Sequence, residues 1–386
     1  MIVADVLQDL AQAARSPGDL LVLLAGDLVL DVEGPDHWLA GIAPAVRAAD
    51  LAIGHLEVPH TRRGTEMAAD VPAPAARPEH LDALARAGFA AVSLAGNHIA
   101  DCGHEGITDT IARLDALGIA HCGAGATLEA ARVPARLDRA GRRIALLSYN
   151  CVGPEAAWAT SDRAGCNYLR IATADGRAVT PAATLTDAAD EALAQLGDDV
   201  AAARAAADLV IVALHKGIVH RPAVLAPYER PLAAAALAAG ADVVVGHHAH
   251  ILRGIERRDG RPVFHGLGNA CVVTRALDPG QDHPARAAWA KRRRELFGFE
   301  PDPRYPLAPF HPQAVHGILG IAIVHADRRL STGVVPIFSE PPGRPVCVRD
   351  DRADAVMAYL ERISAGAGLP ALTWERQSAS VWMCRP

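Results

Sequence analysis

The residues best suited to chemistry are three closely spaced histidines, His247, His248 and His250, in the segment Val245-Gly246-His247-His248-Ala249-His250. Such a cluster is hard to explain structurally, because each buried ring nitrogen needs a partner. Neutral imidazoles that gather in this way are favoured ligands of divalent transition metals. The segment therefore predicts a metal site.

Four further polar groups follow short apolar runs: Gly26-Asp27, His55-Leu56-Glu57, Asn97-His98 with Asp101, and His215-Lys216. Each group alone has an ordinary structural explanation, since a strand-end Asp is commonly a turn former and a lone His is commonly a satisfied structural residue. In an α/β sheet, however, ligands bind where the strand ends and their following loops meet at one edge. The groups taken together therefore indicate one site.

Together these groups offer a mixed oxygen and nitrogen ligand set: Asp27, Glu57, Asn97, His215, His248 and His250. Such a set can hold two adjacent divalent ions bridged by one carboxylate, and a metal pair of this kind deprotonates water near neutral pH. His98 lies next to a ligand, within reach of a substrate leaving group, and Asp101 is placed to orient it. The pattern predicts a binuclear metal-dependent hydrolase with His98 and Asp101 as its catalytic residues.

The elements that must position these groups are predicted from hydrophobic periodicity. Apolar runs typical of buried strands occupy residues 20–25, 50–53, 90–94, 143–148, 208–214, 242–245, 262–267, 317–325 and 333–337. Helical patterns occupy residues 78–87, 106–117, 186–207, 225–239 and 351–363. Their alternation predicts an α/β protein.

Residues 274–315 break this rhythm with seven prolines, several aromatic residues and the basic run Lys291-Arg292-Arg293-Arg294. We interpret the segment as an insertion or lid near the C-terminal third. It separates a core at residues 1–273 from residues 316–386, whose strands and final helix complete the same domain. The basic run either meets an anionic substrate group, such as a carboxylate or phosphate, or forms a solvated helix face.

Composition narrows the possible function classes. The chain has 386 residues, a formal net charge of −6, 51% hydrophobic residues and seven cysteines. The mild acidity argues against a nucleic-acid partner, and the odd number of scattered cysteines argues against a disulfide scaffold. No run reaches about 18 apolar residues, and residues 1–14 lack a signal-peptide pattern. We therefore expect no membrane anchor and a cytoplasmic location.

The order of the motifs resembles the CapA (poly-γ-glutamate capsule synthesis) family, a branch of the calcineurin-like metallophosphoesterase fold. The matching segments are Gly26-Asp27, Leu56-Glu57, Asn97-His98-x-x-Asp101-x-Gly103, His215-x-Gly217, Gly246-His247-His248-x-His250 and Leu267-Gly268-Asn269. The resemblance spans about residues 20–270, with weaker cover to about residue 340. It implies a four-layer α/β/β/α sandwich with a two-metal centre on its loop edge.

The resemblance also implies a role for each matched residue. These roles are one metal on Asp27 and His250, the other on Asn97, His215 and His248, a bridge at Glu57, and substrate assistance by His98. Mn, Fe and Zn all suit such ligands.

The chain departs from the family pattern at several positions. Its first motif reads Asp27-Leu28-Val29 and lacks the usual His, so Asp31 and His55 are candidate replacements. Lys216 stands where the family has Trp, and it is either a substrate contact or a solvated loop residue, as is His220. The full set of candidate substrate-binding residues is His55, Asn150, Lys216, His220, His247 and Asn269.

Two functions of different classes remain open. One is a hydrolase whose metal-bound hydroxide attacks a phosphoester, or an amide or γ-glutamyl bond, in a small-molecule, peptide or phosphorylated substrate. The other is a non-catalytic, metal-stabilised subunit of a poly-γ-glutamate or capsule synthesis or export complex. The missing first-motif His favours the second function. The presence of His98 beside Asp101 favours the first, because a structural metal site needs no substrate-facing His.

Overall fold

The computed structural model describes residues 16–67, 75–278, 280 and 282–385, together with residues 6, 9 and 10. The N-terminal stretch that lacks a signal-peptide pattern lies largely outside the described residues. Within them, no helix is both long enough and apolar enough to cross a membrane. All seven cysteines are buried and none forms a disulfide.

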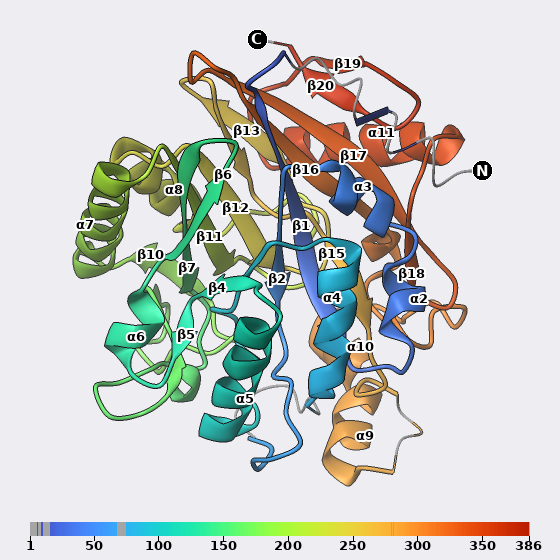
Figure 1. Ribbon diagram of the computed structural model, residues 1–386. Helices are drawn as coiled ribbons and strands as arrows, with labels where there is room; N and C mark the ends of the chain where they lie inside the picture. The colour runs from blue at the N-terminus through green and yellow to red at the C-terminus, as the bar shows by residue number, and fades with distance from the viewer. Residues whose placement is uncertain are drawn as a thin grey trace.

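Two mixed β-sheets dominate the described part of the chain (Figure 1). The larger runs β19 (Trp374–Arg376), β20 (Trp382–Cys384), β17 (Leu330–Glu340), β16 (His316–Val324), β1 (Leu20–Leu30), β2 (Leu51–Leu56), β3 (Ala91–Ser93) and β4 (Ala120–Cys122), with β15 (Asn269–Val273) beside β1 and β18 (Arg344–Cys347) beside β17. The smaller runs β13 (Ile255–Arg258), β14 (Arg261–Phe264), β12 (Val243–His248), β11 (Leu209–Lys216), β7 (Arg142–Asn150) and β6 (Ala135–Arg139). Two short ladders pair β5 (Ala124–Gly125) with β8 (Gly165–Cys166), and β9 (Ile171–Thr173) with β10 (Leu185–Ala188). The α/β prediction is confirmed.

Helices pack against both sheets. The α-helices are α2 (Pro35–Leu39), α3 (Ala43–Ala48), α4 (Asp82–Ala87), α5 (Gly103–Ala116), α6 (Leu128–Arg132), α7 (Asp190–Ala206), α8 (Glu229–Ala238), α9 (Pro284–Lys291), α10 (Arg293–Phe297) and α11 (Asp351–Gly366). Short 3₁₀ turns lie at Pro78–Leu81, Glu155–Ala157 and Pro312–Val315. Figure 1 shows α7 and α8 beside the smaller sheet and α4 and α5 beside the other. The predicted helix at 186–207 starts late, because its first residues pair with β9 as strand β10.

All eleven residues of strand β1 are buried, which explains why its sequence is apolar apart from Gly26 and Asp27. Side chains alternate along a strand. Leu20, Val22 and Leu24 therefore join a buried cluster that includes Leu209 and Ile211 of the smaller sheet. Residues 21 and 23 lie in a second cluster with apolar residues of α3 and α4. Packing on both faces therefore fixes the position of β1, including the segment that carries Asp27.

Some predicted strand ends fall short of the observed ones. Four of the polar side chains therefore lie within strands, namely Asp27, His55, His215 and His248, whereas Glu57, Asn97, His98, Asp101 and His250 follow strands as predicted. Asp27 lies inside β1, because residues 27–30 pair with β15. His55, His215 and His248 are likewise in the last two residues of their strands. The four side chains within strands are thus held by ladder hydrogen bonds, which position a functional group more firmly than a loop does.

A close backbone approach fixes the end of β1 against the loop before β15. A Cβ atom on Gly26 would lie 1.8 Å from the carbonyl oxygen of Gly268. The next residue, Asp27, donates its backbone N–H to that same oxygen at 3.2 Å. Only glycine allows this approach, and the approach places Asp27 opposite Asn269 in the β1–β15 register.

A buried ion-pair network fixes the end of β11. Lys216 Nζ lies 2.6 Å from Glu229 Oε2 at the start of α8, and Arg253 Nη2 lies 3.1 Å from Glu229 Oε1. All three side chains are buried. Burial would raise the pKa of Glu229, but Lys216 and Arg253 lower it to about 2. The carboxylate is therefore the shared counter-charge of two buried cations.

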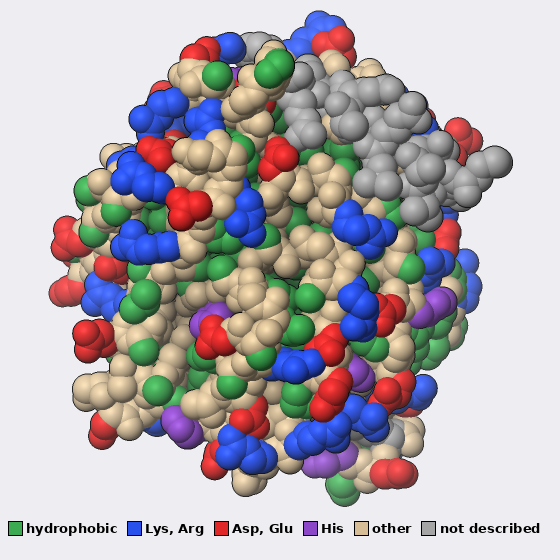
Figure 2. All heavy atoms as spheres, in the orientation of Figure 1, with side chains coloured by type: hydrophobic (Ala, Val, Ile, Leu, Met, Phe, Trp, Pro, Cys, Tyr) green, Lys and Arg blue, Asp and Glu red, His purple; other side chains and the backbone are tan. Residues whose placement is uncertain are grey.

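The segment after β15 packs back over the end of the larger sheet. Its Leu277 and Phe310 form a small buried cluster with Val29 of β1 and Val272 of β15. Helices α9 and α10 belong to the same segment, which we call the lid (residues 274–315). Elsewhere on the surface, basic and acidic side chains are interspersed over the face seen in Figure 2.

Gly26→Ala is expected to destabilise the fold by at least about 2–3 kcal/mol, because overpacking against a fixed carbonyl forces backbone movement. The matched control is Gly197→Ala within α7, where an added Cβ meets nothing within 4 Å. That substitution should stabilise the protein by about 0.5–1 kcal/mol, since alanine favours a helix interior. Urea unfolding measures both, and equal effects of the two substitutions would contradict the packing argument.

Glu229→Gln is expected to cost about 3–5 kcal/mol at pH 7, because it leaves two buried cations without a counter-charge. The folded-state pKa of Glu229 lies below its ordinary 4.5. Its stabilisation is therefore complete above pH 4.5 and is lost as the pH falls toward 2. Unfolding free energies of wild type and variant should converge below pH 4.5. Glu79→Gln, in an exposed pair with Arg62, is the control and should change nothing measurable.

Candidate metal centre

The site forms where the ends of four strands from the two sheets meet. In the larger sheet, Asp27 of β1 is in register with His55 of β2. In the smaller sheet, His215 of β11 is in register with His247 of β12. The carboxyl ends of parallel strands lie at one edge of a sheet, so these residues meet although the sequence separates them widely.

One group of donor atoms combines Asp27, Glu57 and His250, whose ligand atoms lie within 4.8 Å of one another. His250 Nε2 is 3.2 Å from Glu57 Oε1, and His250 Nδ1 is 3.7 Å from Asp27 Oδ2. Asn269 Oδ1 lies 3.0 Å from His250 Nδ1 and orients the ring. Burial opposes protonation of His250, but Glu57 and Asp27 raise its pKa to about 9. This group concentrates negative charge that a cation would neutralise.

The second group combines Asp27 with His55 and His215, again within 4.8 Å. Burial first, and neighbouring histidines next, lower the pKa of His55 to about 4 and that of His215 well below its ordinary value. His215 Nε2 lies 2.8 Å from Asn97 Oδ1, and His55 Nδ1 lies 2.9 Å from Ser93 Oγ. If His215 Nε2–H donates to Asn97, the lone pair is on Nδ1. Both imidazoles are thus neutral and held by one nitrogen, as metal-binding histidines are.

Several buried polar atoms of the two groups have no hydrogen-bond partner among the residues that the structure describes: His55 Nε2, Glu57 Oε2 and His215 Nδ1. Orphaned atoms of this kind are costly, and each one in a folded protein needs an explanation. The orphaned nitrogens of His55 and His215 are the ones opposite their structural hydrogen bonds. The donor set therefore fits a divalent ion, and thiolates contribute nothing to either group.

Gly96 makes room for the second group. A Cβ atom there would lie 2.9 Å from His55 Nε2 and 3.5 Å from His215 Cε1. The rings of His55 and His215 are 4.6 Å apart, so the two imidazoles pack together over this residue. Any side chain at position 96 would displace a donor atom.

The remaining histidines of the cluster surround the same carboxylate. His247 Nδ1 lies 3.4 Å from Asp27 Oδ1, and its ring stacks on His55 at 4.7 Å. His248 has its ring 4.7 Å from that of His215. Both His248 and His250 have left-handed backbones, with φ of 88° and 50°. Such conformations are strained for non-glycine residues and gather at functional sites.

His98 and Asp101 form a buried pair at the edge of the donor groups. Asp101 Oδ2 lies 2.6 Å from His98 Nδ1. A carboxylate at Nδ1 fixes the tautomer, so this ring would exchange protons with a substrate through Nε2. The pair has the geometry of a general acid and its orienting group.

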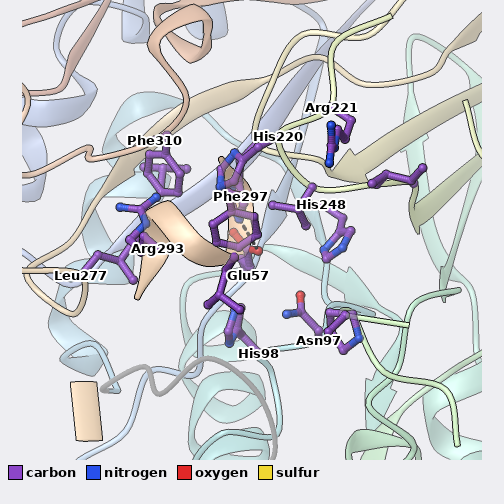
Figure 3. A pocket seen from close by; sticks show the side chains of 18 of the residues that line it. Glu57, Asn97, His98, His220, Arg221, His248, Leu277, Arg293, Phe297 and Phe310 are labelled. Carbon is purple, nitrogen blue, oxygen red and sulfur yellow. Dashed lines mark ion pairs between the residues drawn. The ribbon is translucent and has the colours of Figure 1, made fainter. Parts of the chain in front are cut away.

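A cavity of about 500 Å³ opens beside the cluster. Its polar wall includes Glu57, Asn97, His98, His248 and His250. The lid supplies the facing wall through Trp289, Arg293, Leu296, Phe297 and Phe310. Figure 3 shows Glu57 between Arg293 and Phe310 on one side and His248 and Asn97 on the other. The cavity is thus enclosed by the donor cluster, the lid and further segments at residues 181–185 and 217–221, which are distant in sequence.

The six candidate substrate contacts occupy different places. His220 lines the cavity with its ring 4.9 Å from Phe297. His55 is itself a donor residue of the second group, whereas His247 lies beside Asp27 and Asn269 beside His250. Lys216 is sequestered in the ion pair with Glu229. Asn150 is buried, and its amide bonds to the backbone of its own loop at residues 152–153.

The sequence indicates an insertion or lid at residues 274–315 but assigns no role to the aromatic side chains in this segment. Trp289, Phe297 and Phe310 lie on the cavity wall, and the aromatic content of this otherwise Ala-rich chain was the available signal. Asp31 also lines the cavity; its carboxyl accepts a hydrogen bond from Thr274, and burial raises its pKa to about 6. It lies outside both donor groups.

Curated relatives cover part of this chain. Capsule biosynthesis protein CapA of Bacillus anthracis is 26% identical and covers 65% of this chain and 57% of its own length. PGA biosynthesis protein CapA of Bacillus subtilis (strain 168) is 27% identical, with 67% and 62% covered. A Mycobacterium tuberculosis (H37Rv) protein, named for an accessory role in polyglutamine synthesis, is 33% identical, with 60% and 59% covered. The chain spans about three fifths of these relatives' length.

One solved structure, a proposed 5′-nucleotidase from Staphylococcus aureus in complex with alpha-ketoglutarate, aligns with a TM-score of 0.42 at 12% identity, over 88% of this chain and 58% of that one. The family model described as bacterial capsule synthesis protein PGA_cap matches residues 2–272. This match covers most of the chain and includes every donor residue of the site. It confirms the CapA resemblance: the chain belongs to the bacterial capsule synthesis protein PGA_cap family.

Proposed function

We propose that this chain is a metal-dependent hydrolase of the CapA and metallophosphoesterase type, acting on a phosphoester or on an amide or γ-glutamyl bond. The observation that carries the proposal is the combination of orphaned, buried donor atoms with the His98–Asp101 pair, next to one cavity that is lined by Glu57, His98 and His250. A purely structural metal site explains the donor atoms but leaves the acid–base pair without a role.

We also infer the four-layer α/β/β/α arrangement of the metallophosphoesterase type. Two features support it. Inward-facing residues from both sheets share one buried cluster, which includes Val22 of β1 and Ile211 of β11. The opposite strand faces pack with helix residues, among them Leu84 of α4 and Leu232 of α8.

The metal ligands would be divided between the two donor groups. Glu57 and His250 would hold one ion, His55 and His215 the other, and Asp27, which belongs to both groups, would lie between them. This assignment places Asp27 where the family resemblance implies Glu57. It also gives His55 the position left open by the missing first-motif histidine. Mn, Fe or Zn suits this nitrogen and oxygen set.

A bound metal pair would supply an activated water at neutral pH and neutralise charge on the reacting group. The protein's own residues do the rest. Asn97 holds His215, and Asn269 holds His250, so both rings are oriented before substrate arrives. His98 Nε2 would give a proton to the leaving group. Asp101 stabilises the protonated form of His98 that this step requires.

The alternative function is a non-catalytic accessory subunit of a capsule or poly-γ-glutamate synthesis complex. It is favoured by the name of the Mycobacterium tuberculosis relative, which refers to an accessory role. The same donor cluster would then serve stability alone. The two functions differ in what His98 does, and an experiment can separate them.

Protein purified without chelators is expected to carry about two equivalents of Mn, Fe or Zn, measured by plasma mass spectrometry. Gly96→Ala should lower this to about one, because its Cβ displaces the His55 donor atom. His55→Ala/His215→Ala should do the same. His104→Ala, an exposed histidine elsewhere, should leave the content unchanged. A content of less than about a tenth of a metal equivalent per chain, after reconstitution with each metal, would contradict the metal-centre assignment.

His98→Ala is expected to lower kcat by about 10²–10⁴-fold while metal content stays at the wild-type value. The measurement uses p-nitrophenyl phosphate for phosphoesters and γ-glutamyl-p-nitroanilide for amides, each with the metal found above. Asp101→Asn should lower kcat less than His98→Ala does. The asparagine keeps the His98 ring in place but lacks the negative charge that stabilises its protonated form. If the wild-type, metal-loaded protein hydrolyses neither compound nor related esters and amides, the accessory function is favoured.

A further inference from the structure

Arg293 differs from its neighbours in the basic run of the lid. Its side chain is only 3% exposed, and none of its three guanidinium nitrogens has a hydrogen-bond partner among the described residues. Arg292 and Arg294 instead reach into solvent, where they lie 3.6 Å from Glu295 and 3.4 Å from Glu300. The run therefore combines a solvated helix face with one arginine that is turned inward.

Aromatic rings surround this buried guanidinium. Its Cζ lies 5.7 Å from the ring centre of Trp289, 5.9 Å from Phe299 and 5.8 Å from Phe310. Cation–π contacts of this kind hold the group in place but provide no counter-charge. Burial lowers the pKa of Arg293 to about 10, so it stays charged at neutral pH.

A buried cation without a counter-charge is costly for the free protein. Other buried cations of this chain avoid that cost, as Lys216 and Arg253 do by sharing Glu229. Arg293 is different because it lies on the cavity wall opposite the donor cluster (Figure 3). Asp31 also lines the cavity, but its carboxyl accepts a hydrogen bond from Thr274, and no ion pair joins it to Arg293 within the described part of the chain. The missing counter-charge is thus one that a ligand can bring.

We propose that Arg293 binds a second anionic group of the substrate, a carboxylate or a phosphate, carried by the same molecule as the bond that is cleaved. This inference rests on the proposed hydrolase function and narrows its substrate class. The planar guanidinium offers paired N–H donors that match either anion. The aromatic wall keeps water from competing, so a substrate whose second group is neutral would leave the cation unpaired.

The test measures anion binding directly, without turnover. Glutarate and inorganic phosphate are titrated calorimetrically into the full-length protein, both as purified and after metal removal. The variants are Arg293→Met, Arg293→Lys and, as a matched neighbour, Arg294→Met. We expect one of the two anions to bind metal-stripped wild type, with at least about tenfold loss in Arg293→Met. Arg293→Lys should be intermediate and Arg294→Met unchanged.

Thermal unfolding of the same proteins separates ligand binding from a structural role. Without anion, Arg293→Met should melt about 2 °C or more above wild type, because the buried, unpaired charge is gone. With saturating anion, wild type should regain that difference while Arg293→Met shows no shift. The inference is overturned if neither anion binds wild type, or if Arg293→Met binds as wild type does. Because anion binding is read after metal removal, its failure is distinct from failure of the metal centre.

Discussion

The approach of two backbone segments at Gly26 and Gly268 is the constraint on which the site depends. At this point β1 has no space for a side chain, and its next residue bonds to the opposing carbonyl. Asp27 is thereby fixed at the junction of the two donor groups. The same approach sets the register that places Asn269 beside His250. A hydrophobic core could form without this contact, but the carboxylate common to both groups would then have no defined position.

Several buried acceptor atoms around the Asp27 carboxylate have no hydrogen-bond donor within the described part of the chain. Hydrogen bonds with Asn97 Oδ1 and Ser93 Oγ engage one nitrogen each of His215 and His55, and the opposite nitrogens have no hydrogen-bond partner in the described part of the chain. Each unpaired atom costs a modest amount of folding free energy, and the summed cost is large, because all of these groups are buried away from water. In the proposed function, stability and activity would therefore be coupled, because the ions that would perform the chemistry would also offset the cost of burying the donor atoms.

Much of this could be predicted from the sequence. The apolar runs predicted the buried strands, and the polar residues at their ends predicted which side chains meet, because parallel strands bring their ends together. Long-range pairing could not be predicted in the same way. That Lys216 faces Glu229 instead of the cavity depends on where α8 docks. That Asn150 bonds within its own loop depends on a turn the pattern does not specify. Arg293 illustrates the same limit, since four consecutive basic residues give no sign of which one faces inward.

The burial of Arg293 behind aromatic rings has a consequence for how the protein responds to its medium. Dissolved ions screen exposed charges over about 8–10 Å at physiological ionic strength, and surface arginines such as Arg292 and Arg294 lose most of their attraction under those conditions. Arg293 is only 3% exposed, so the diffuse ion atmosphere of the solvent cannot surround its guanidinium as it surrounds an exposed charge. Its pull on an anion is therefore short in range and nearly indifferent to salt. Arg293 would therefore contribute little to the association rate of an anionic ligand and would mainly slow its dissociation.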